Sequence, residues 1–319
     1  MTARGGQGSA ASLVLVGLAC QEVGASFAVM LFPHTGPLGI VMLRLLFSAV
    51  LLLVIARPRL RGHTGYAWRS VIGFGVVLAS MNGLFYLALQ RLPLGVTVTI
   101  EVLGPLTLSI LTATGVARWV WAGLALGGVA ALGAGGWDRL DALGVLFALG
   151  AAVSWALYIL ASARVGREFP RLDGLALAMT VGAVIALPFG IAQASSALLR
   201  LDILAIGAAV ALLSSTIPYA LELVALRRLA ASAFAILMSL GPATASLAGF
   251  LLLGQHLSWL ELAGIALVIT ASIGAVLAAA RRSAGARHPG PDADEPRRRS
   301  AGARHPGPDA DEPLSEPVG

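Results

Sequence analysis

Ten stretches of about 20 mainly apolar residues run through the chain, and they restrict its possible folds more than any other feature. A helix needs about 20 such residues to cross a hydrocarbon core ~30 Å thick, in which unpaired backbone groups cannot be left. The stretches cover residues 11–32, 36–56, 70–90, 95–114, 119–135, 141–162, 173–193, 203–226, 231–252 and 259–280. The links between them are too short for a separate soluble domain. The sequence therefore predicts an all-α, polytopic membrane protein with ten transmembrane helices.

The composition agrees with a membrane protein. Of the 319 residues 57% are hydrophobic and only 12% are charged, whereas soluble domains have about 25% charged residues. The basic residues form no stripe interleaved with aromatic residues, so nucleic acid is not an expected partner. The lipid bilayer is the expected surrounding.

A long internal repeat indicates how the ten helices are organised. The string ALQRLPLGVTVTIEVLGP at Ala88–Pro105 returns as ALRRLAASAFAILMSLGP at Ala225–Pro242, with seven of eighteen positions identical. The first copy joins the third predicted span to the fourth, and the second joins the eighth to the ninth. The repeating unit is therefore five spans, and because five is odd the second unit must cross the membrane upside down. Inverted repeats of this kind are typical of transporters, with the substrate site between the halves.

These observations divide the chain into three parts. Residues 1–140 and 141–280 are the two predicted five-helix repeats. After them the string RRSAGARHPGPDADEP occurs at Arg281–Pro296 and again at Arg298–Pro313. It is rich in proline, glycine and charge and cannot bury enough apolar surface to fold. Residues 281–319 are therefore predicted to be a disordered tail.

The arginines predict the orientation, because positive charge is preferentially retained on the cytoplasmic side. With the N-terminus inside, thirteen arginines are cytoplasmic: Arg4, Arg57, Arg59, Arg61, Arg69, Arg118, Arg164, Arg167, Arg171, Arg227, Arg228, Arg281 and Arg282. Only Arg91, Arg139 and Arg200 are outside. Both termini, and the tail, are therefore predicted to be cytoplasmic.

Polar and ionisable side chains inside the predicted spans are the candidate substrate site, since such groups are costly in lipid. They are Gln21, Glu22, Asn82, Tyr86, Glu101, Trp155, Tyr158, Tyr219 and Glu222. Together they predict a cavity with aromatic walls, amides and one or two carboxylates. Three prolines inside spans, Pro105, Pro218 and Pro242, are candidate points at which helices bend during gating.

Some of these residues have a competing structural interpretation. Trp155 and Tyr158 share a helix face and could serve as packing residues. Glu22 could be an ion-pair partner as readily as a cavity carboxylate. Arg44, in LRLLFSAV, has two interpretations. The favoured one is structural, with Arg44 paired with a glutamate of a neighbouring span or leaning toward a helix end, and the other is substrate binding.

Several strings carry a family resemblance that runs from about Ala11 to Ala280. They are VGAS at Val23–Ser26, LRL at Leu43–Leu45, MNGLFYLALQRLPLGVTVTIEVLGPL at Met81–Leu106, SWALYILASAR at Ser154–Arg164 and STIPYALELVALRRL at Ser215–Leu229. With ten spans in two repeats, the chain resembles the drug/metabolite transporter superfamily, EamA type, and within it the bacterial threonine and homoserine exporters. The resemblance implies export of amino acids by alternating access through a central cavity, without catalytic residues, metal or other cofactor.

The sequence therefore predicts an exporter of small amino acids in the bacterial inner membrane. Threonine-like and homoserine-like substrates are expected, and the range could extend to methionine and aromatic amino acids. Proton coupling and a monomeric or dimeric state stay open. Export of another metabolite or a drug is the alternative, and an intramembrane enzyme acting on lipid is a second one. The enzyme is disfavoured because His256 stands nearly alone in its loop, with no acid paired to it.

Overall fold

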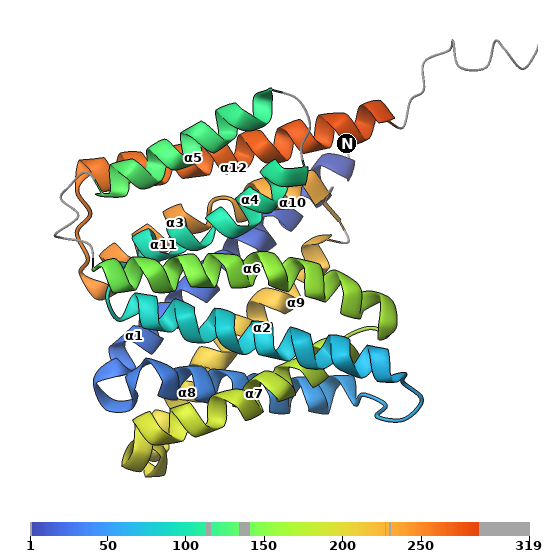
Figure 1. Cartoon of the computed structure of the whole chain (residues 1–319), viewed down its shortest axis with the longest axis vertical. Coiled ribbons are helices and arrows are strands. Elements are labelled where there is room, and N and C mark those ends of the chain that lie inside the picture. Colours follow the sequence, from blue (N-terminus) through green and yellow to red (C-terminus); the bar gives the residue numbers. More distant parts are fainter. Residues whose placement is uncertain (1, 113–115, 134–140, 227, 230, 287–319) are drawn as a thin grey trace, which may run out of the picture. The chain divides into compact units, whose positions relative to one another are not determined.

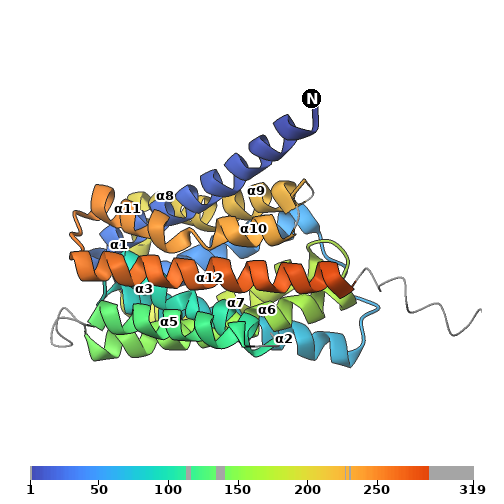
Figure 2. The ribbon, with the colours of Figure 1, turned by 90° about the horizontal axis from the view of Figure 1, so that it is seen from above.

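The computed structural model describes residues 2–112, 116–133, 141–226, 228–229 and 231–286. Residues 1–279 form one unit, and Ala280–Gly319 form a second. Within the described ranges the regular structure is entirely helical (Figures 1 and 2). The predicted tail falls almost wholly outside those ranges.

The helices follow one another in the order α1 (Thr2–Ala56), α2 (Gly65–Leu89), α3 (Leu94–Glu101), α4 (Leu103–Thr112), α5 (Ala117–Gly133), α6 (Ala142–Glu168), α7 (Asp173–Ala194), η2 (Ser195–Leu199), α8 (Leu201–Ala211), η3 (Leu212–Thr216), α9 (Ile217–Leu226), α10 (Ala231–Met238), α11 (Gly241–Leu253) and α12 (Trp259–Ala286). Of these, η2 is a 3₁₀-helix and η3 is a π-helix.

Seven described segments are long and apolar enough to cross a membrane, and the prediction of an all-α polytopic membrane protein is confirmed. Each predicted apolar stretch lies largely on described helix. The first two stretches share one of the seven segments, Ala10–Ala56. Two more fall on the shorter apolar helices Arg118–Leu132 and Leu201–Thr216.

The first two stretches are joined by a sharp turn within α1. Gly36 has φ 65° and ψ 167° and lies between Pro33 and Pro37, and this backbone conformation favours glycine because it has no Cβ. The turn removes the helical partner of the Leu38 amide. Gln193, at the end of α7, replaces that partner, since its Oε1 accepts a hydrogen bond of 2.6 Å from the Leu38 N–H.

Two other spans are interrupted at positions that the repeat relates. The fourth breaks at Val102, between α3 and α4, and the ninth at Ser239–Leu240, between α10 and α11. Advancing Val102 by the repeat offset of 137 residues gives Ser239. The interruptions precede Pro105 and Pro242, so these prolines lie in the first turns of α4 and α11. A first-turn proline loses no helical hydrogen bond, because its N–H would have no partner there.

Pro218 is also near the start of a helix. It is the second residue of α9 and follows the π-helix η3. The wider turn of a π-helix occurs mostly as a single-turn irregularity, often at functional sites. All three prolines thus stand just after a helix irregularity, and their predicted role in gating stays a prediction.

The helices enclose the site by contacts between distant parts of the chain. The half of α1 after Gly36 packs along α7, and α2 packs against α6 and α7; Figure 1 shows α2 beside α6. The half of α1 before Gly36 contacts α9 and α10, and α3 contacts α11. Helices from the two predicted repeats therefore alternate around the centre of the molecule.

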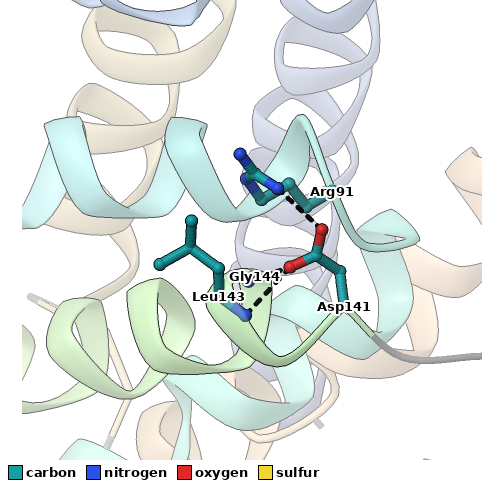
Figure 3. A network of polar contacts seen from close by, with 4 residues as sticks. All are labelled: Arg91, Asp141, Leu143 and Gly144. Carbon is teal, nitrogen blue, oxygen red and sulfur yellow. Dashed lines mark hydrogen bonds and ion pairs between the residues drawn. The ribbon is translucent and has the colours of Figure 1, made fainter. Parts of the chain in front are cut away.

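A polar network outside the spans fixes the start of α6 (Figure 3). One carboxylate oxygen of Asp141 accepts hydrogen bonds from the N–H groups of Leu143, at 2.9 Å, and Gly144, at 3.0 Å. The other carboxylate oxygen pairs with Arg91 at 2.7 Å. The Gly144 N–H and the Arg91 guanidinium hold the pKa of Asp141 below its usual value.

Replacing Asp141 with alanine is expected to lower the midpoint of thermal unfolding, because α6 loses its N-terminal cap. Asp141→Asn retains an oxygen acceptor and should lie between wild type and alanine. Since the folded-state pKa is depressed, the carboxylate stabilises above its unfolded pKa, and that contribution is lost as the pH falls through the folded value. Thermal unfolding of detergent-solubilised protein measures both effects. An equal midpoint for Asp141→Ala and wild type at neutral pH would contradict the capping role.

Candidate functional site

A cavity of about 160 Å³ lies where the two interrupted spans meet α1, α2, α6 and η3. Most of its lining is polar or aromatic: Gln21, Glu22, Arg44, Asn82, Phe85, Glu101, Trp155, Tyr158 and Ser214. The remainder is apolar or small: Leu18, Ala25, Met81, Val98, Val102, Met238 and Gly241. The cavity thus brings together residues from nearly the whole length of the chain.

Six of the nine predicted site residues line this cavity: Gln21, Glu22, Asn82, Glu101, Trp155 and Tyr158. Tyr86 is next to it but fully buried, with 0% exposure. It reaches the site through its hydroxyl, which accepts a hydrogen bond of 3.3 Å from Arg44. The side chains of Tyr219 and Glu222 lie outside the described residues.

Two carboxyl groups and one guanidinium are the acidic and basic groups of the cavity lining. Glu22 lies on the first half of α1 and is 2% exposed, and Glu101 is the last residue of α3. Both carboxyl groups and the Arg44 guanidinium line the same cavity. Burial of such groups in a protein within lipid is costly, so groups of opposite sign are expected to be close together.

Arg44 is held in place by several groups. Its Nε donates to the Ser215 hydroxyl at 3.1 Å, and one terminal nitrogen donates to the Ser214 carbonyl at 2.9 Å. The guanidinium also lies 5.6 Å from the centre of the Tyr86 ring, in reach of a cation–π interaction. Both interpretations of Arg44 stay open, because it contacts η3 and also lines the cavity.

The Ser214 carbonyl that accepts from Arg44 belongs to the π-helix η3, and the residue four positions on, Pro218, has no N–H to donate to it. The Ser214 hydroxyl donates to the Val210 carbonyl at 2.5 Å, which keeps that side chain on its own helix. Gly24 of α1 lies against this turn, and a Cβ on Gly24 would come within 3.0 Å of the Ser214 backbone nitrogen. The irregular turn and the small residue together let α1 and η3 approach beside the cavity.

Asn82 is turned partly toward its own helix, since its Nδ2 donates to the Leu78 carbonyl at 2.9 Å. An amide has one oxygen acceptor and two hydrogens, so Asn82 retains hydrogen-bonding capacity on the cavity side. Ser154 is another polar residue within a predicted span. Its hydroxyl donates a hydrogen bond of 2.8 Å to the Gly150 carbonyl, and it does not line the cavity.

The apolar part of the lining was not predicted. Met81 and Phe85 stand one residue before and three residues after Asn82 on α2, and Val98 stands one turn before Glu101 on α3. A search for residues one helical turn from each polar candidate would have found Phe85 and Val98, but not Met81. Met238 occupies the position in the second repeat that Glu101 has in the first, and both line the cavity.

Comparisons with known proteins give one consistent result. The sequence profile of the EamA-like transporter family matches residues 142–277. The threonine/homoserine exporter RhtA of Escherichia coli K12 is 36% identical over 273 residues, which are 85% of this chain and 92% of that protein. RhtA of Salmonella typhimurium LT2 is 35% identical over 267 residues, 83% of this chain and 90% of that protein.

Two more distant matches extend this result. The uncharacterized transporter YvbV of Bacillus subtilis 168 is 28% identical over 172 residues, 49% of this chain and 54% of that protein. One crystal structure superposes with a TM-score of 0.57 at 18% identity, covering 85% of this chain and 98% of the other. At that identity the superposition supports the fold alone. Sequence identity above 30% over nearly the full length of the relatives places the chain among transporters rather than enzymes, and the chain belongs to the EamA-like transporter family of the drug/metabolite transporter superfamily.

Proposed function

We propose that this protein is an inner-membrane exporter of small neutral amino acids of the threonine and homoserine type. The observation that carries the proposal is a cavity with an arginine and two carboxyl groups, in a chain that is 36% identical to RhtA over 92% of that exporter. An amino acid carries an ammonium and a carboxylate on neighbouring atoms. Recognition of such a zwitterion needs one group of each sign, and the cavity has both.

The lining suggests a role for each polar group. Arg44 would attract the substrate carboxylate, and Glu101 with Glu22 would attract the ammonium. Asn82 would form hydrogen bonds to the side-chain hydroxyl of threonine or homoserine. Phe85, Trp155 and Tyr158 would form the wall around the substrate's apolar carbons, and the same wall could accept methionine or aromatic amino acids.

The proposed architecture is two inverted repeats of five helices, residues 1–140 and 141–280. Three observations support it. The sequence repeats at Ala88–Pro105 and Ala225–Pro242; the interruptions fall at equivalent positions, Val102 and Ser239–Leu240; and both Glu101 and Met238 line the cavity. The arginine distribution supports cytoplasmic termini. Alternating access would follow from rocking of one repeat against the other.

Counterflow of radiolabelled solute in liposomes tests the proposal. Vesicles loaded with unlabelled threonine or homoserine are expected to accumulate labelled threonine when they contain the wild-type protein. Glu101→Gln should reduce this accumulation. Gly73→Ala is the matched control, because a Cβ at Gly73 has no neighbouring atom within 4 Å.

Competition in the same vesicles defines the substrate range and tests the alternatives. Methionine and aromatic amino acids should compete if the aromatic wall accepts them. A proton gradient imposed across the vesicles should change the rate only if export is coupled to protons. Absence of counterflow with all twenty amino acids would contradict amino-acid export and favour a different metabolite or a drug.

A further inference from the structure

One apolar cluster joins the two predicted repeats directly beside the cavity. It consists of Ala25 of α1, Leu89 of α2, Leu94 and Val98 of α3, and Ala245 and Ala248 of α11, and we call it the outer plug. All six residues are at most 8% exposed. Ala25 and Val98 also line the cavity, so the plug forms the boundary of the cavity on that side.

Two contacts hold α3 against α11 at the plug. Gly95 lies so close to Ser246 that a Cβ on Gly95 would come within 2.9 Å of the Ser246 Cα. Gln255, in the segment after α11, accepts a hydrogen bond of 2.9 Å from the Leu94 N–H. That N–H belongs to the first turn of α3, where backbone donors have no helical partner. The Gln255 side chain, which comes after α11 in the chain, therefore caps the N-terminus of α3.

The same positions in the other repeat are arranged differently. Moving back by the repeat offset of 137 residues takes Ala248 to Leu111 and Leu253 to Val116. Ala248 is 8% exposed, whereas Leu111 is 73% exposed and Val116 is 81% exposed. Ala248 is therefore covered by α3, whereas the equivalent Leu111 is largely uncovered by protein.

We propose that the outer plug, with Gly95, Ser246 and Gln255, is the gate that closes the cavity to the cell exterior, and that the present conformation is closed on that side. This inference rests on the proposed function for its orientation and for transport itself. In an exporter, this gate must be closed while substrate is loaded from the cytoplasm. Release outside would require α3 and α11 to separate.

A disulfide tests the gate directly. The Cβ of Leu94 lies 3.5 Å from an ideal Cβ built on Gly249, within the ~3.5–4.5 Å range of disulfides. That Cβ would also lie 2.6 Å from the Gln255 Oε1, so the Gln255 side chain must shift, and Gly249→Cys alone is the control for this effect. In a Cys20→Ala background, which removes the chain's one cysteine, L94C/G249C is expected to lose both free thiols on mild oxidation. Counterflow should then stop, and a reductant should restore it. Absence of cross-linking, or normal counterflow by the cross-linked protein, would overturn the proposal.

Thiol labelling in the same cysteine-free background tests the closed gate. With a water-soluble maleimide, Ala248→Cys should be protected. Adding Gln255→Ala, which removes the cap on α3 without adding bulk, should raise labelling of Ala248→Cys several-fold. Ready labelling of Ala248→Cys with Gln255 in place would overturn the assignment.

These readouts separate the two proposals. Thiol chemistry needs no substrate, so the gate can be established in a protein that moves no amino acid. Cross-linking of L94C/G249C without counterflow by the wild-type protein would contradict amino-acid export alone. Counterflow by the wild-type protein without cross-linking of L94C/G249C would contradict the gate alone.

Discussion

Gly104→Ala is expected to destabilise the protein severely and to remove most of it from the folded, membrane-extracted fraction. A Cβ at this position would overlap the Ala152 carbonyl oxygen of α6 and come within 2.7 Å of its carbonyl carbon and 3.2 Å of its Cα. These are backbone atoms, so no side chain can rotate away, and α4 would have to separate from α6. Overpacking of this kind costs about 3 kcal/mol at the upper end of its usual range.

Gly73→Ala is the matched control for this substitution. It makes the same chemical change inside α2, where nothing lies within 4 Å of the added Cβ. Helix propensity alone should make it neutral or stabilising by up to about 1 kcal/mol. Thermal unfolding in detergent and the yield of monodisperse protein measure both variants. Equal midpoints for the two would show that α4 and α6 are not in close contact beside the cavity.

Arg44→Gln is expected to reduce counterflow of threonine about 10- to 100-fold. A hydrogen bond to a charged group is worth about 1.5–3 kcal/mol, which corresponds to that range of affinity. Arg44→Lys should recover part of the loss, since it keeps the charge but not the planar fork of donors. The half-saturation concentration for threonine in counterflow is the measurement.

A carboxylate-free analogue distinguishes substrate binding from support of η3, which Arg44 also contacts through Ser214 and Ser215. The amino alcohol of threonine has a hydroxymethyl group in place of the carboxylate. It should compete weakly with threonine in the wild-type protein and almost equally in Arg44→Gln. If the substitution weakens both solutes by the same factor, Arg44 acts only by holding the cavity wall.

The sequence predicted the parts of the fold that depend on local signals. Apolar runs of membrane length lie on helices. Glu101 could be recognised because it is an ionisable residue inside such a run, three residues before the pair Gly104-Pro105. Bending during gating was predicted at Pro105 and Pro242, and this role stays a prediction. The interruptions lie two or three residues before these prolines, and each proline stands in the first turn of the next helix.

Cavity membership was harder to predict, because it depends on which helix faces meet. Tyr86 has the right spacing from Asn82 but is covered by Phe32 and Phe85, so only its hydroxyl reaches the site, through Arg44. Met238 and Gly241 carry no polar signal and enter the cavity because α10 and α11 are interrupted there. Such residues can be assigned to the cavity lining only once the arrangement of distant helices is known.

The turn at Gly36 has a mechanical consequence. The Gln193 side chain links α7 to the backbone of α1 by accepting a hydrogen bond from the Leu38 N–H. Next to this hydrogen bond, Gly190 of α7 lies against Met42 of α1, and Gly39 of α1 lies against Ala194 of α7. Close contacts between a glycine on one helix and a side chain on the other resist sliding, because neighbouring residues interlock at short range. We therefore expect the seam between α1 and α7 to stay fixed while other helices move.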